Sequence, residues 1–124
     1  MRMFRAAAVA VGLAGTVVLA LAPAASAGSA QRTGACAAGQ LCLWPKAHFK
    51  GQAQVAELEG TTTESCVPLP EGTSALSLAN RTGHPVTTYQ SATCGETGEF
   101  QTYPSGTWAP ESPYVVRAYK VWER

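Results

Sequence analysis

From about residue 40 onward the chain consists of short runs rich in apolar and aromatic residues, which alternate with polar ones in 52–55 and 74–79, and the runs are separated by turns rich in glycine, proline or asparagine. Runs of about four to eight residues with this alternation are typical of β-strands. The pattern predicts strands at 41–44, 52–58, 74–79, 86–90, 100–103 and 114–122. A helical face also fits the last run, but its valine, tyrosine and tryptophan content favours a strand. We therefore predict an all-β fold with little helix.

The second predicted strand and the segment after it depart from simple alternation. The apolar phase slips at Val55 and Ala56, which predicts a bulge within 52–58. Residues 59–71 combine Gly60, three consecutive threonines and two prolines, so we expect a long loop there.

A weak internal repeat divides the predicted strands into two halves. Trp44 and Phe49 have the same spacing as Tyr89 and Cys94, 45 residues later. In the first half we expect Phe49 to pack back toward Trp44, and Gly51 to take a backbone shape that a Cβ atom would forbid. Short strands with turns at near-regular intervals predict antiparallel Greek keys packed as a two-sheet sandwich.

The first residues of the chain have the pattern of a removable export signal. Arg2 and Arg5 precede an apolar run at 6–21, and 25–27 reads Ala-Ser-Ala, a small-x-small cleavage pattern. The run is short for a membrane span, and no cluster of lysine and arginine follows it. We therefore predict a signal peptide at 1–27, a disordered lead-in at 28–34 and one secreted, monomeric domain at 35–124.

The predicted mature chain is nearly neutral. Loss of Arg2 and Arg5 leaves seven of the nine basic residues against eight acidic ones. Nucleic acids and anionic membranes are bound through clusters of lysine and arginine, and the mature chain has none. We expect neither a nucleic-acid partner nor, after removal of the signal, a membrane partner.

All four cysteines lie in the predicted mature chain, and an even number in an exported protein indicates two disulfides. Three pairings can be drawn. The short spacing favours Cys36 with Cys42, which leaves Cys66 with Cys94. A zinc site is disfavoured because the cysteines are not spaced as Cys-x-x-Cys pairs. We expect no metal and no cofactor.

The chain carries little of what an enzyme needs. It has no aspartate, and its two histidines, His48 and His84, fall in predicted turns. Neither a Gly-x-Ser-x-Gly nor a His-Glu-x-x-His motif occurs, so we predict that the protein is not an enzyme. Trp44, Trp108 and Trp122 could stack on sugars, although core packing is favoured for Trp44 and Trp122. An extracellular binding module is thus one alternative function.

Several segments together resemble a known family. They are Cys36-Ala-Ala-Gly-Gln-Leu-Cys42-Leu-Trp44, Phe49-Lys-Gly51, 74–80, 89–95 and 116–119. With them the chain is similar, from residue 35 to about 122, to the secreted actinobacterial proteins grouped with the Streptomyces metalloproteinase inhibitor. The resemblance implies a double Greek-key fold of the βγ-crystallin type. It also implies a secreted peptidase inhibitor whose partner is an extracellular protease, with a metalloprotease as the expected target.

The resemblance further implies a reactive bond beside a cysteine in a hairpin of the second half, here Cys94-Gly95. No later cysteine braces this bond, and Gly95 lacks the bulky apolar side chain that a thermolysin-like enzyme prefers after the scissile bond. Cys66-Val67 is the alternative, because Val67 is apolar and Pro68 stiffens the chain. The candidate inhibitory residues are therefore Cys66, Val67, Cys94 and Gly95, with a slight preference for Val67.

The crystallin resemblance also raises calcium binding. Gly72 and Thr73 stand where calcium-binding crystallins carry paired Asp or Asn, and Leu76 stands where they carry Ser or Thr. Calcium needs converging carboxylate and carbonyl oxygens, so we expect no site. A glycosylation acceptor pattern, Asn80-Arg81-Thr82, is also present.

Overall fold

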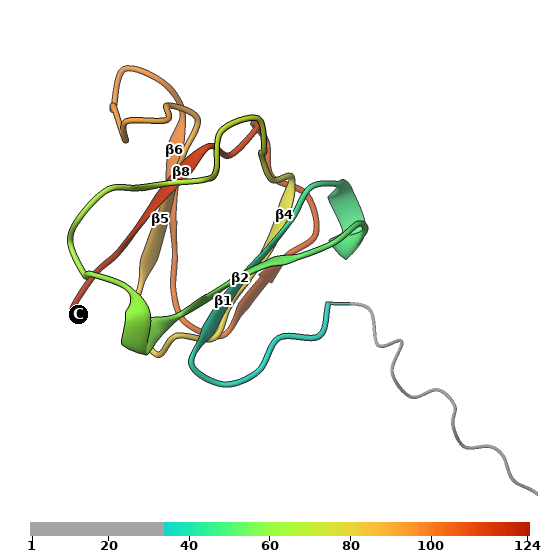
Figure 1. The fold of residues 1–124 in the computed structure, drawn as a ribbon, viewed down its shortest axis with the longest axis vertical. Coiled ribbons are helices and arrows are strands. Elements are labelled where there is room, and N and C mark those ends of the chain that lie inside the picture. The colour runs from blue at the N-terminus through green and yellow to red at the C-terminus, as the bar shows by residue number, and fades with distance from the viewer. Residues whose placement is uncertain (1–33) are drawn as a thin grey trace, which may run out of the picture. The chain divides into compact units, whose positions relative to one another are not determined.

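The computed structural model describes residues 34–124, which form two four-stranded antiparallel sheets without an α-helix (Figure 1). The first sheet has the order β2 (Gln54–Glu57), β1 (Gln40–Trp44), β4 (Ser77–Asn80) and β7 (Thr107–Ala109). The second has the order β3 (Val67–Pro68), β8 (Ala118–Val121), β5 (Val86–Tyr89) and β6 (Phe100–Tyr103). Two short 3-10 turns are η2 (Ala47–Phe49) and η3 (Leu58–Gly60). The all-β prediction is confirmed, whereas the predicted signal peptide and lead-in residues 28–33 lie outside the described residues.

Each sheet takes three strands from one half of the domain and its fourth from the other half. β7 comes from the second half and pairs with β4 of the first sheet. β3 comes from the first half and pairs with β8 of the second sheet. The two halves therefore complete each other and share one core.

That core lies between the sheets. Leu41 and Leu43 of β1 face Val86 of β5 and Val121 of β8 across it, and all four are at most 1% exposed. Burial of an aliphatic side chain contributes about 1.5–3 kcal/mol, so these residues are the main source of folding free energy. The remaining buried members are Leu69, Ala75, Leu78, Tyr103, Ala109, Tyr114, Val116 and Tyr119.

A second apolar cluster covers the outer face of the first sheet. Cys42, Trp44 and Ala79 are buried there, and Phe49 and Ala53 pack against them. The Trp44 and Phe49 rings meet edge to face with centroids 5.1 Å apart, as predicted. Because β1 is buried on both faces, it reads as a continuous apolar run and does not alternate.

The predicted bulge in 52–58 is wrong. β1 and β2 pair without interruption from Gln40–Glu57 to Leu43–Gln54. Val55 lies on the outer face and is 50% exposed, and Ala56 packs against the core. The sequence pattern slips because Val55 is an apolar residue on the outer face, whereas Ala56 and Leu58 both pack against the core, and no residue is inserted.

Other strands also differ from the prediction: β2 covers only 54–57 of the expected 52–58, and β7 was not expected. β3 lies inside the segment expected to be a loop, and β4 starts and ends later than predicted. β8 covers only 118–121 of the expected 114–122. The limits of β4 and β8 coincide with their pairing to β1 and β5, and β3 exists through its pairing with β8. These partners are distant in the chain, so no local pattern reports the strand ends.

Candidate functional site

The four candidate inhibitory residues meet at one disulfide. Cys66, just before β3, is bonded to Cys94, with 5.9 Å between their Cα atoms. Cys94 lies in residues 90–99, which connect β5 to β6 and are called the second hairpin below. Val67 and Gly95 are the neighbours of the two bonded cysteines. The two alternative reactive bonds, Cys66–Val67 and Cys94–Gly95, are therefore linked by one disulfide.

The second hairpin projects beyond the strand ends, as the orange loop of Figure 1 shows. Gln90 and Glu99 close its base: Gln90 N donates to Glu99 O at 2.9 Å, and Glu99 N donates to Gln90 Oε1 at 3.2 Å. Ser91 organises its first turn, where its Oγ accepts from Thr93 N at 3.1 Å and its carbonyl accepts from Cys94 N at 3.2 Å. Together with the disulfide, these bonds hold the hairpin in one shape.

The backbone around the candidate bond places different demands on its two residues. Cys94 has a left-handed φ of 58°, which is unfavourable for a residue with a Cβ atom. Gly95 does not have a left-handed φ, so its backbone conformation is open to other residues. A Cβ atom there would lie 3.2 Å from Ser91 Oγ, so that hydroxyl would have to move by only a few tenths of an ångström. The hairpin can therefore accept a side chain at Gly95.

Val67 is less available for contact with a partner. It pairs with Tyr119 of β8, and its half-buried side chain packs against the core between the sheets. A side chain that already fills a core position cannot enter an enzyme cleft without unpacking. Geometry therefore favours the second hairpin over the alternative at Val67.

The exposed side chains of the second hairpin are polar and acidic, and an aromatic ring lies next to them. Glu96, Thr97 and Glu99 are exposed. Phe100 follows with 46% of its surface exposed, and its ring stacks on Tyr89 at 6.0 Å. Burial, and secondarily the charge of Glu96, raises the pKa of Tyr89 above its usual 10.0. The exposed acidic, polar and aromatic side chains of the second hairpin can contact a partner protein, and none of the side chains named here is a nucleophile beside a base.

The two histidines lie in loops as expected. His48 Nε2 is 3.1 Å from Glu111 Oε2, and both side chains are mostly exposed. The His84 ring nitrogen Nδ1 is 2.9 Å from the carbonyl of Glu123. Within residues 34–124 no three His, Cys, Asp or Glu side chains converge as metal ligands. The same residues contain no helix of the length and apolar character needed to span a membrane.

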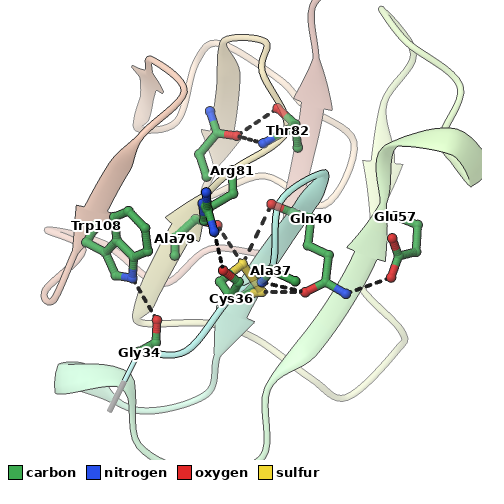
Figure 2. The surroundings of a disulfide bond; sticks show 11 residues. Gly34, Cys36, Ala37, Gln40, Glu57, Ala79, Arg81, Thr82 and Trp108 are labelled. Carbon is green, nitrogen blue, oxygen red and sulfur yellow. Dashed lines mark hydrogen bonds between the residues drawn. A yellow bond between two sulfur atoms is a disulfide. The ribbon is translucent and has the colours of Figure 1, made fainter. Parts of the chain in front are cut away.

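The other disulfide, Cys36–Cys42, ties the start of the domain to the outer face of the first sheet (Figure 2). Trp108 Nε1 donates to Gly34 O at 2.7 Å, and Arg81 Nη1 donates to Cys36 O at 3.1 Å. Arg81 also lies 5.8 Å from the centre of the Trp108 ring, a cation–π distance. Gly34, expected in the lead-in, is thus held in the domain, and Trp108 fastens this segment while its ring stays 43% exposed.

Asn80, which the sequence singled out only as the acceptor of a glycosylation pattern, has a structural role. Its side chain is fully buried, and Nδ2 donates to His84 O at 2.8 Å and to Tyr103 O at 3.0 Å. Its Oδ1 accepts from Thr82 N at 3.1 Å and from Thr82 Oγ1 at 2.8 Å. The acceptor amide of the glycosylation pattern is therefore fully used inside the fold and cannot be reached in the folded domain.

The chain matches the family model described as Peptidase inhibitor family I36 over residues 29–102. The match covers more than half of the chain and includes all four cysteines and the second hairpin. Neither a curated protein nor a solved structure matches the chain at a significant level.

Proposed function

Because the chain belongs to peptidase inhibitor family I36, we propose that it binds an extracellular peptidase and blocks the enzyme's cleft with the second hairpin. The observation that supports this choice of site is the Cys66–Cys94 disulfide, which fixes a projecting loop to the edge of the second sheet. A loop that is already fixed loses little conformational entropy on binding. Two disulfides favour an oxidising compartment, in agreement with export through the predicted signal at 1–27.

We propose a metalloprotease as the target class, and the Cys94–Gly95 bond as the bond presented to it. Support for the target class comes from the sequence resemblance to the Streptomyces metalloproteinase inhibitor type. Support for the bond comes from the projecting hairpin and from the core packing of Val67. The exchange of β3 and β7 between the sheets supports the double Greek-key arrangement that the same resemblance implies.

An inhibition assay tests the function and the target class together. The oxidised domain should inhibit a thermolysin-like metalloprotease at stoichiometric concentrations, and a subtilisin-like serine protease should be unaffected. Inhibition of the serine protease alone would show that the target class is wrong. If neither enzyme is inhibited and both digest the domain slowly, the alternative of an extracellular binding module becomes the better description.

Two matched glycine substitutions test the proposed bond. Gly95 and Gly98 lie in the same hairpin, neither has a left-handed φ, and a Cβ atom at either would stand 3.2 Å from the end of one side chain. Gly95→Leu places an apolar side chain directly after Cys94, so it should lower the inhibition constant for the metalloprotease by about tenfold. Gly98→Leu should leave the constant within about twofold of the parent.

Val67→Ala tests the alternative bond, Cys66–Val67. This substitution should reduce thermal stability, because Val67 packs against the core, but leave the inhibition constant of the folded protein unchanged. The bond assignment is wrong if Gly98→Leu improves inhibition as much as Gly95→Leu. It is also wrong if Val67→Ala abolishes inhibition while the protein remains folded.

A binding module remains the second candidate because of Trp108. Its ring is 43% exposed, and an exposed aromatic ring can stack on a sugar ring. Retention of the domain on insoluble polysaccharide, lost in Trp108→Phe, would favour this function.

A further inference from the structure

The segment that connects β1 to β2, residues 45–53, is the structural counterpart of the second hairpin and is called the first hairpin below. Trp44 and Tyr89 end the equivalent strands β1 and β5. Five residues after each, Phe49 and Cys94 have nearly the same left-handed φ, 61° and 58°. In Figure 1 the two hairpins lie at different corners of the domain, so each can contact a partner independently.

The first hairpin is rigid although it contains no disulfide. His48 and Phe49 both have a φ of 61°, and each left-handed residue costs about 1–2 kcal/mol. His48 N donates to Pro110 O at 2.7 Å, and Phe49 N donates to Ser77 Oγ at 3.0 Å. Ser77 Oγ in turn donates to Lys46 O at 2.6 Å. These bonds fix an unfavourable conformation, which is common at recognition sites.

Two lysines face each other on this rigid hairpin. Lys46 and Lys50 are direct cross-strand partners, with Lys46 N donating to Lys50 O at 3.2 Å, and both are exposed. Directly opposed residues have side chains on the same face, about 5 Å apart at Cβ, and like charges in this arrangement repel. In the described part of the chain, the one contact within 4.0 Å between a basic and an acidic side chain joins His48 to Glu111. Neither lysine ammonium therefore has a carboxylate partner there.

We propose that Lys46 and Lys50 form a cationic clamp for a phosphate group of an anionic polymer. Two ammonium groups on one face can both reach the oxygens of a single phosphate, and lysine binds phosphate as a point charge. Binding removes the repulsion between the lysines, and the rigid hairpin loses little entropy. A polymer of linked phosphates is favoured over free phosphate because the charges of neighbouring phosphates add to the attraction between the two ammonium groups and the bound phosphate. This activity is separate from inhibition by the second hairpin.

NMR titration of the oxidised domain tests the clamp. Inorganic polyphosphate should shift backbone amide signals of residues 45–51, and it should bind about tenfold or more tightly than inorganic phosphate per phosphate group. Lys46→Gln and Lys50→Gln should each weaken binding at least fivefold. Lys120→Gln is the matched control, because Lys120 lies on another sheet, over the Trp122 ring at 5.3 Å, and it should bind like the parent.

Thermal melts separate loss of the site from loss of the fold. At low salt Lys50→Gln should melt at or above the parent temperature, since one of two repelling charges is gone. Polyphosphate should raise the melting temperature of the parent but not of this variant. The clamp is wrong if the shifted amides lie elsewhere, or if Lys120→Gln weakens binding equally. Self-association at low salt that Glu96→Gln abolishes would instead identify the second hairpin of another copy as the partner, and would overturn the polymer.

Discussion

Gly51 and Gly106 have the same φ of +91°, yet they differ in the space available to a side chain. A Cβ atom at Gly51 would stand 2.5 Å from Pro45 Cγ, whereas nothing lies within 4 Å of one at Gly106. The Pro45 ring is closed on its own backbone nitrogen, so it cannot rotate away from such a Cβ atom. Glycine is therefore required at position 51 by the left-handed φ and by the contact with Pro45, and at position 106 by the left-handed φ alone.

This difference gives a prediction about stability. Gly106→Ala should lower the free energy of unfolding by about 1 kcal/mol, the cost of a left-handed φ. Gly51→Ala should cost at least about 1–2 kcal/mol more, because the first hairpin must also open around Pro45. Urea unfolding of both variants measures the two values. Equal losses would show that the contact with Pro45 relaxes without cost.

At the scale of elements, the two disulfides hold different parts of the fold. Cys36–Cys42 closes a ring over a separation of 6 residues at the edge of the domain, and Cys66–Cys94 spans 28 residues and joins the two halves. The chain-entropy model gives about 2 kcal/mol for the short ring and about 3–4 kcal/mol for the long one.

Replacing Cys66 and Cys94 by alanine together should therefore destabilise the domain more than replacing Cys36 and Cys42, by about 1 kcal/mol or more. The first double variant should also weaken peptidase inhibition beyond its effect on folding, because the second hairpin loses its anchor. Urea unfolding and inhibition at a temperature where both variants are folded measure the two effects. A larger loss of stability in the Cys36–Cys42 variant would contradict the entropic argument.

The sequence predicted the elements that have a local pattern. β6 begins and ends where expected, and β1 and β5 differ by one residue, since β-branched, apolar or aromatic residues and flanking turn residues coincide there. β3 and β7 are only two and three residues long, and both exist through pairing with the other half, so they leave no pattern of their own. The adjacency of Val67 and Gly95 follows from the Cys66–Cys94 pairing that the cysteine spacing favoured, and the structure confirms this pairing. The sequence could not tell which of the two residues is free to contact a partner, because the packing of Val67 against the core depends on strands distant in the chain.

At the scale of the whole molecule, the core contains ionisable groups that must stay neutral. Tyr103, Tyr114 and Tyr119 are at most 7% exposed, and burial raises the pKa of each above its usual 10.0. Tyr114 is also held by a hydrogen bond from its hydroxyl to Thr88 O at 3.0 Å. The folded state thus keeps these protons at a pH where the unfolded chain releases them.

The domain should accordingly lose stability as pH rises above about 10, by up to about 1.4 kcal/mol per pH unit for each of these tyrosines, and it should show no loss from them at lower pH. Thermal melts between pH 8 and about 11, followed by tyrosinate absorbance, measure this. Tyr114→Phe should lose less stability than the parent over the same pH interval. Full tyrosinate absorbance in the still-folded protein would contradict the assignment.

The place of β8 in the second sheet has a consequence for how the protein is made. β8 lies between β3 and β5, yet it follows every other described strand in the chain. The first sheet is likewise complete only after β7 has been synthesised and has paired with β4. The second sheet cannot close over the core until residues 118–121 have been synthesised, because its strand between β3 and β5 does not yet exist. For a protein exported as proposed above, the position of β8 at the end of the strand order delays folding. The chain therefore stays unfolded, and able to pass through an export channel, until its last strand has been translated.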